Sequence, residues 1–280
     1  MNNQNINSAW SAVVPILRKC SFYDIKDIVG LAGFERKALN ALVYYDSWSN
    51  QITDTDKLVS DIEGHFLDFT DEIKQSFLNI VIEEILSDSY NQNSYSRNDK
   101  KKLEERLQYC LNRLGWQLID KKVLPIEILD LPDLNELDSS AREDLIKAAV
   151  KFRDGDLSGA ISSACAAVDS VTKRVYRDKN LGDINESRSF QERCNKSLET
   201  VGVFKAIDQQ LIEIKWKSSN ITQFKNNLKQ SLNQAAYVMQ ALRSNMSDVH
   251  GTKPVIKPLV FDSIKWSQII VRLLSEKYED

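Results

Sequence analysis

Two residues near the C-terminal end of the chain form the most informative chemical pair in the sequence. Arg243 and His250 stand seven positions apart in the segment LRSNMSDVHG, and the chain holds only two histidines in all. On an α-helix seven residues are close to two turns, so both side chains would leave one face, roughly 10 Å apart along the axis. A guanidinium binds phosphate oxygens, and an imidazole exchanges protons near neutral pH. The pair therefore predicts a site that can break a phosphodiester bond without a metal ion.

The composition is that of an ordinary globular protein with room for two domains. The chain has 280 residues, of which 42% are hydrophobic and 28% charged, and its few glycines and prolines disfavour an all-β fold. No segment approaches the roughly 20 apolar residues that span a bilayer. The N-terminal segment MNNQNINSAW lacks the layout of a signal peptide. We therefore expect a cytoplasmic protein with no membrane partner.

The charges are divided unevenly between the two halves of the chain. Residues 1–140 carry 15 Lys and Arg against 23 Asp and Glu, whereas residues 141–280 carry 22 against 17. The half that contains Arg243 and His250 is therefore the basic one, which is compatible with a nucleic-acid ligand.

The cysteines do not indicate a metal site. Cys20, Cys110, Cys165 and Cys194 are scattered, with no Cys-x-x-Cys spacing. We expect unpaired structural thiols in a reducing compartment, no zinc and no cofactor. The second histidine, His65, lies in the acidic half and is expected to be structural.

Apolar residues recur at three- and four-residue spacing along most of the chain, which predicts an all-α fold. Asp24 and Thr70 stand where N-caps are expected, and Gly30 and Gly33 mark a turn between helices. The predicted N-terminal helices cover residues 10–20, 34–48, 55–66, 69–86 and 100–114, and the C-terminal ones cover about 139–153, 156–179, 187–200, 204–218, 220–247 and 261–279.

Three segments are predicted in the domain organisation. Residues 1–90 form a helical sensing or docking domain. Residues 91–138 form a linker, a helix and an extended strap with a possible short β-pair. Residues 139–280 form a helical bundle. The helix–Gly–helix pattern over residues 24–42 could also indicate a helix-turn-helix, but its second helix carries only Arg36 and Lys37, so we favour a packing or protein-docking module.

The C-terminal half resembles the HEPN superfamily, and more specifically the C-terminal domain of abortive-infection proteins. A helix rich in small residues runs from Ala160 to Lys173 and contains the acid Asp169. A long helix then ends in LR, six further residues and HG, and a closing amphipathic helix follows. The family often places Asn, Asp or His directly after the arginine. This chain has Ser244, which can donate and accept a hydrogen bond.

This resemblance implies a metal-independent endoribonuclease that acts as a toxin or effector in antiphage defence. HEPN nucleases dimerise, so each protomer would contribute a histidine to one cleft, and the products would end in a 2′,3′-cyclic phosphate. Asp169 would orient Arg243 or His250, or else pair with Lys173 at four-residue spacing. Trp216 would stack on a base or lie in the core. The expected RNA-binding residues are Lys173, Arg174, Arg177, Lys215, Trp216, Lys217 and Asn245.

Two other functions stay open at this point. A non-catalytic HEPN-like module could bind RNA or a partner protein as a regulatory subunit, and Ser244 is the feature that favours it. Alternatively, the acidic N-terminal half could mediate assembly of a protein scaffold. A nucleotidyl-transferring role is disfavoured, because the sequence has neither a glycine-rich phosphate loop nor a carboxylate cluster.

Overall fold

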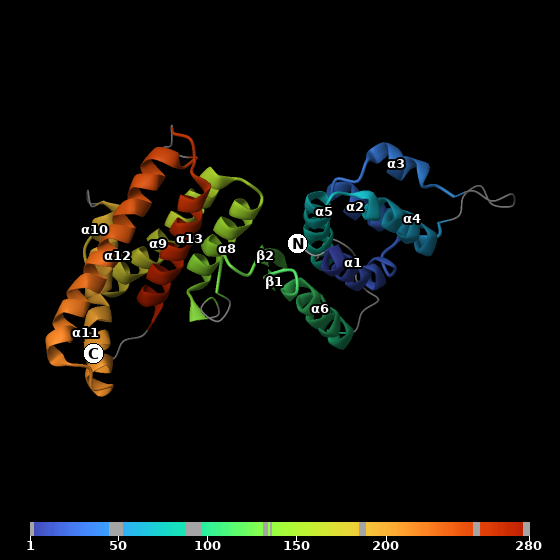
Figure 1. Cartoon of the computed structure of the whole chain (residues 1–280). Helices are drawn as coiled ribbons and strands as arrows, with labels where there is room; N and C mark the ends of the chain where they lie inside the picture. Colours follow the sequence, from blue (N-terminus) through green and yellow to red (C-terminus); the bar gives the residue numbers. More distant parts are fainter. Residues whose placement is uncertain are drawn as a thin grey trace. The chain divides into compact units, whose positions relative to one another are not determined.

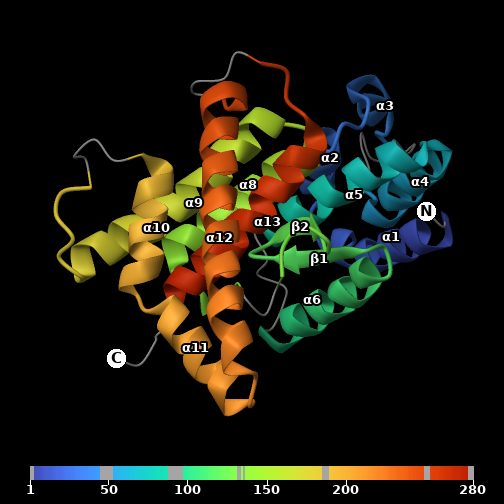
Figure 2. The ribbon, with the colours of Figure 1, turned by 60° about the vertical axis from the view of Figure 1, so that its left-hand side comes forward.

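The computed structural model describes residues 3–44, 53–87, 97–130, 134, 136–184, 189–248 and 253–276. The chain divides into two compact units, Met1–Ile126 and Glu127–Asp280, and the described residues of both are mostly helical (Figures 1 and 2). The prediction of a mainly helical fold is therefore confirmed. None of the described helices is both long and apolar enough to cross a bilayer.

Unit 1 contains six described helices and one pair of strands. Its N-caps are set by short polar side chains: Ser21 Oγ accepts a hydrogen bond from the Asp24 backbone N–H, and Thr70 caps the helix that follows it. Thr70 is thus the predicted cap, whereas Asp24 lies in the first turn, where its charge favours the helix dipole. The elements are α1 (Asn3–Leu17), α2 (Phe22–Leu31), α3 (Arg36–Ala41), α4 (Thr55–Asp68), α5 (Asp71–Leu86), α6 (Arg97–Asn112), β1 (Trp116–Ile119) and β2 (Lys122–Pro125).

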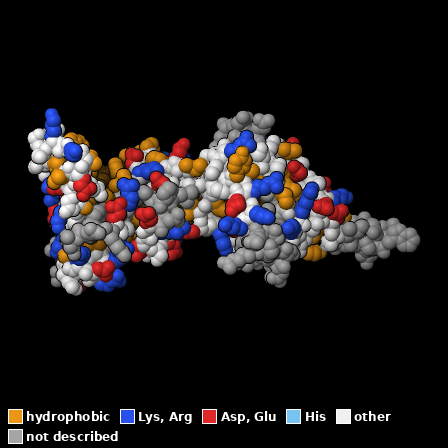
Figure 3. All heavy atoms as spheres, turned by 90° about the horizontal axis from the view of Figure 1, so that it is seen from below, with side chains coloured by type: hydrophobic (Ala, Val, Ile, Leu, Met, Phe, Trp, Pro, Cys, Tyr) orange, Lys and Arg blue, Asp and Glu red, His pale blue; other side chains and the backbone are white. Residues whose placement is uncertain are grey.

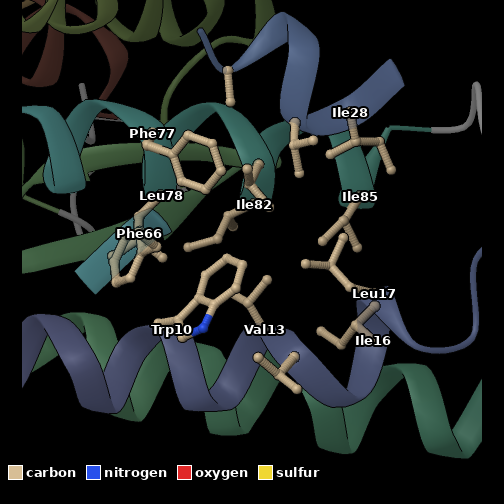
Figure 4. Packing of buried hydrophobic residues seen from close by; sticks show 14 of the residues in the cluster. Trp10, Val13, Ile16, Leu17, Ile28, Phe66, Phe77, Leu78, Ile82 and Ile85 are labelled. Carbon is tan, nitrogen blue, oxygen red and sulfur yellow. The ribbon is translucent and has the colours of Figure 1, made fainter. Parts of the chain in front are cut away.

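Aromatic side chains fill the centre of unit 1 (Figure 4). Trp10 of α1 stacks on Phe66 of α4 with ring centroids 4.8 Å apart, and Phe77 of α5 lies 6.0 Å from Trp10. All three rings are buried. His65 is exposed and is therefore not part of this core. Its ring contacts that of Phe34 edge-on, with centroids 5.3 Å apart.

The helix and strands expected in the connecting segment 91–138 belong to unit 1. Leu107 and Leu111 of α6, together with Trp116 and Val123 of the strands, are buried in its core. The expected short β-pair is an antiparallel hairpin in which Ile119 pairs with Lys122. Its two turn residues both have positive φ, as a type I′ turn requires. The burial of these apolar side chains places α6 and the two strands in unit 1.

Unit 2 contains six described helices, and each of the C-terminal helices predicted from the sequence is present. Helix α9 lies at the centre and packs against α8, α10, α12 and α13 (Figure 2). Its buried positions include Ala160, Ala164 and Ala167, which let neighbouring backbones approach closely. Ser267 Oγ of α13, for example, donates to the Ala164 carbonyl at 2.6 Å. The helices are α8 (Ser139–Arg153), α9 (Leu157–Asp178), α10 (Phe190–Thr200), α11 (Val203–Glu213), α12 (Ser218–Met246) and α13 (Lys257–Ser275).

The aromatic core of unit 1 predicts the effect of truncating Phe66. Replacing this fully buried ring with alanine removes its stacking on Trp10 and leaves a cavity, so Phe66→Ala should lower the free energy of unfolding by about 3–5 kcal/mol. Ile73→Ala on the neighbouring helix is the control, because that side chain is exposed and should change stability by less than about 0.5 kcal/mol. Urea denaturation followed by circular dichroism measures both, and similar losses for the two variants would contradict the packing.

Candidate functional site

The central feature of the site is an ion pair between two helices that lie far apart in the sequence. Arg243 Nη1 of α12 donates to Asp169 Oδ2 of α9 at 2.6 Å, across 74 residues of chain. The side chain of Asp169 is 15% exposed and that of Arg243 is 34% exposed. Because the carboxylate is largely removed from water, it needs partners of opposite charge. The alternative pair between Asp169 and Lys173 is not formed among the described residues, and Lys173 is exposed.

A second arginine, which the sequence analysis did not identify, shares the same carboxylate. Arg193 Nη2 of α10 donates to Asp169 Oδ1 at 3.0 Å. Asp169 thus holds one guanidinium on each oxygen and joins three helices. Arg193 carries no local pattern that would distinguish it from a surface cation. The one local signal nearby is the capping box of Ser189 and Glu192, which marks the start of α10. It indicates that Arg193 lies on a helix but not what Arg193 contacts.

A layer of amide side chains holds α10 against α12 beside this cluster. Gln240 Oε1 accepts from the Gln191 backbone N–H at 3.1 Å, and Gln191 Nε2 donates to Asn233 Oδ1 at 2.7 Å. Asn195 also donates to Asn233. These bonds hold α10 and α12 together, and these are the helices that carry Arg193 and Arg243. The positions of the two arginines relative to each other are therefore fixed.

Two buried cysteines flank the acid. Burial raises the pKa of Cys165 to about 12, with the charge of Asp169 adding to the rise and that of Arg243 opposing it. Burial, again with Asp169, raises the pKa of Cys194 to about 12. Both thiols therefore stay protonated at neutral pH and behave as small apolar groups. All four cysteines are unpaired, as the sequence predicts.

The residues that follow Arg243 are described only in part. Ser244 and Asn245 are exposed, and Asn245 Nδ2 donates back to the Ala241 carbonyl at 2.7 Å. The Asp248 carboxylate accepts from Ser162 of α9, and the Lys253 backbone N–H donates to the Asn245 carbonyl at 2.9 Å. His250 lies outside the described residues. Both flanks of residues 249–252 are thus anchored close to the end of α12 that bears Arg243.

The other basic residues predicted on α9 have different surroundings. Arg174 donates to Asp138 at 3.1 Å and to the Leu274 carbonyl at 3.1 Å, so it joins α9 to the segment before α8 and to α13. Arg177 pairs with its neighbour Asp178 and is largely exposed. Lys173 alone of the three is exposed without an ion pair among the described residues.

The structure does not bring Lys215, Trp216 and Lys217 to this site. They precede the first residue of α12, whereas Arg243 lies near its last. At 1.5 Å per residue the 25 steps from Ser218 to Arg243 span about 37 Å. Within one protomer these three residues therefore do not lie beside Arg243. Trp216 is also not in the core, because it is 40% exposed, and its ring packs against that of Phe224 with centroids 5.1 Å apart.

The shared carboxylate predicts a stability effect in unit 2. Asp169→Asn should lower the free energy of unfolding by about 2–3 kcal/mol, because two partly buried guanidinium groups lose their charged partner. Asp178→Asn removes the acid of an exposed pair on the same helix and should cost less than about 1 kcal/mol. Equal effects in urea denaturation would show that Asp169 is not a packing centre.

The buried thiols predict a dependence of stability on alkaline pH. A thiol whose pKa is raised on folding, here from 9.0 to about 12, stabilises the folded state below its unfolded pKa, and this contribution is lost as pH rises toward the folded pKa. The free energy of unfolding of wild type should therefore fall more steeply between pH 8.5 and 10 than that of Cys165→Ala/Cys194→Ala. Parallel pH profiles for the two proteins would contradict the burial of these thiols.

Among the described residues no three His, Cys, Asp or Glu side chains come together as a metal site would require. Comparison with known proteins adds no relative: the chain matches no protein-family model, no curated protein and no solved structure. What the site does must therefore be inferred from its own side chains.

Proposed function

We propose that unit 2 is a HEPN-like endoribonuclease that cleaves RNA without a metal ion and acts as an effector of antiphage defence. The observation that supports the proposal is the contact between Asp169 and Arg243. This contact joins the acid of α9, the helix rich in small residues, to the arginine that stands seven positions before His250. These are the elements on which the resemblance rests, and the contact links two of them in space.

The reaction follows from the groups present. RNA carries its own nucleophile, the ribose 2′-hydroxyl, so cleavage requires removal of that proton, stabilisation of the charged phosphorane and protonation of the 5′ oxygen. Arg243 contacts the phosphate through those N–H groups that do not bind Asp169. His250 acts as general base or general acid, because an imidazole near its reference pKa of about 6.5 is populated in both forms at neutral pH. The products carry a 2′,3′-cyclic phosphate.

One imidazole cannot readily perform both proton transfers in a single turnover. A homodimer through the C-terminal unit supplies two, one from each protomer, around a single scissile bond. In this proposal Asp169 is a positioning residue, because it holds the guanidinium and does not itself contact RNA. Ser244, which is exposed beside Arg243, can donate a hydrogen bond to a second phosphate oxygen. Lys173 and Asn245, which are both exposed, can contact flanking nucleotides.

The N-terminal unit would then restrain or trigger the nuclease. An enzyme that cleaves cellular RNA must be held inactive until it is needed. Unit 1 has its own core and can therefore respond to a partner protein independently of the site.

A non-catalytic RNA- or protein-binding module is the second candidate. The Asp169 carboxylate already occupies one N–H group of Arg243 and neutralises part of its charge. A guanidinium held in this way could serve to bind a ligand as well as to stabilise a transition state.

Incubation of the purified full-length protein with total RNA in EDTA tests the proposal. Wild type should produce fragments with 2′,3′-cyclic phosphate ends, and His250→Ala and Arg243→Ala should each reduce the rate by at least about a hundredfold. Asp169→Asn should reduce the rate less than Arg243→Ala does, because it only positions the arginine. Arg18→Gln is the matched control, since this arginine lies in unit 1, where it pairs with Asp56, and it should cleave like wild type.

Each outcome distinguishes the two candidates. Fragments produced equally by wild type and His250→Ala would show that the cleavage comes from a contaminant or another site. RNA binding without cleavage, lost in Arg243→Ala, would select the non-catalytic module.

A further inference from the structure

Helices α11 and α12 of unit 2 meet in a turn that carries a cluster of exposed apolar side chains, which we name the α11–α12 tip. Every residue from Ile212 to Asn220 is exposed. The apolar members of the tip are Ile212, Ile214, Trp216 and Phe224, which are 63%, 72%, 40% and 38% exposed.

The tip is an end of the helical bundle rather than a groove. The chain reverses between Glu213 and Ser218, where Lys215 adopts a left-handed φ of 59°. Beyond it only Ile221 of the first ten residues of α12 is buried. In Figures 1 and 2 this turn lies at the lower end of unit 2, on the opposite end of α12 from Arg243.

Positive charge accompanies the apolar residues. Lys215 and Lys217 alternate with Ile214 and Trp216, and neither lysine has an ion pair among the described residues. From residue 214 to residue 247 the sequence contains no Asp or Glu. Figure 3 shows hydrophobic, basic and acidic side chains next to one another on the left-hand part of the face that it presents. Glu213 is the one acid among the exposed residues 212–220, so the two lysines leave the tip with a small excess of positive charge. The tip therefore complements a partner that is both apolar and anionic.

We propose that the α11–α12 tip docks on the surface of an anionic lipid bilayer. Isoleucine and phenylalanine enter the boundary of the acyl chains, tryptophan takes the interfacial position that its amphipathic ring favours, and lysines reach back to the lipid phosphates. The bilayer is contacted and not crossed, which is compatible with the absence of a spanning helix among the described residues. The proposal departs from the sequence-based expectation that the protein has no membrane partner.

RNA explains the tip less completely than lipid does. Base stacking would use Trp216 and Phe224, but these rings already pack against each other. The two most exposed members, Ile212 and Ile214, offer nothing to a phosphate or to a base face. A bilayer accounts for the four apolar residues and the two lysines together.

The test is co-sedimentation of the full-length protein with vesicles of phosphatidylcholine alone or with 30% phosphatidylserine. Wild type should bind the anionic vesicles and bind the neutral ones at least about tenfold more weakly, since each lysine near such a surface contributes roughly fivefold in affinity. Ile212→Ser/Ile214→Ser should weaken binding to anionic vesicles about tenfold or more. Lys215→Gln/Lys217→Gln should remove most of the preference for phosphatidylserine and of the salt dependence.

Matched controls keep the result specific to the tip. Ile256→Ser/Ile269→Ser changes two exposed isoleucines elsewhere in unit 2 and should bind vesicles like wild type. Circular dichroism should show the same helix content in all variants, because the replaced side chains are exposed.

Three outcomes would overturn the proposal. The first is failure of wild type to bind anionic vesicles, and the second is equal binding by the tip variants and wild type. The third is that the tip variants lose RNA binding, or change from dimer to monomer by light scattering, while vesicle binding is unaffected. The RNA fragmentation assay in solution is independent of this result, because the tip lies about 37 Å from Arg243 along α12.

Discussion

The carboxylate of Asp169 is the constraint on which the organisation of unit 2 depends. It stands on a helix that neighbouring helices cover over much of its surface, at a position that is 15% exposed. A charge in such surroundings is tolerated only when it is paired and hydrogen-bonded. Arg193 and Arg243 supply that pairing from two other helices, so the need to satisfy one acid fixes where α10 and α12 lie relative to α9. The guanidinium that the proposed reaction needs is therefore held in place by the same interaction that helps to hold the bundle together.

Most helices of this protein could be predicted from the sequence because their signals are local, although the helix expected over residues 34–48 ends at Ala41. Apolar spacing identifies α8, α9, α12 and α13 within a few residues of their observed bounds, and Thr70 marks the start of α5 as expected. The contacts of Asp169 are not local. Its partners lie 24 and 74 residues away, and the local pattern instead offered Lys173 one turn along the same helix. Arg243 could be identified from its spacing to His250, whereas no sequence motif contains Arg193.

The sequence was least informative about which residues lie close together in space when the only signal was a shared charge or polarity along the chain. Lys215, Trp216 and Lys217 share the basic half of the chain with Arg243, but they precede the first residue of α12, and Arg243 lies 25 residues after that residue. Similarly, residues 91–138 were expected to connect the two halves as a linker, a helix and an extended strap. The side chains of Leu107, Leu111 and Val123 are instead buried in the core of unit 1. In both cases the deciding factor is three-dimensional packing, which charge balance and polarity along the chain do not report.

Helix α12 therefore carries two chemically distinct ends. At one end Arg243 is half-buried, paired and fixed by the amide contacts of Gln240 and Asn233 to α10. At the other, Trp216 and its neighbours are exposed beside lysines that lack a paired acid among the described residues. A rigid helix of this length keeps the two ends about 37 Å apart, so a surface that holds the tip does not obstruct a ligand at the arginine. The absence of acidic residues along residues 214–247 serves both ends, because a phosphate of RNA and a phosphate of a lipid are repelled by the same carboxylates. One acid-free helix is thus compatible with the two anionic partners proposed for it, RNA at one end and a lipid surface at the other.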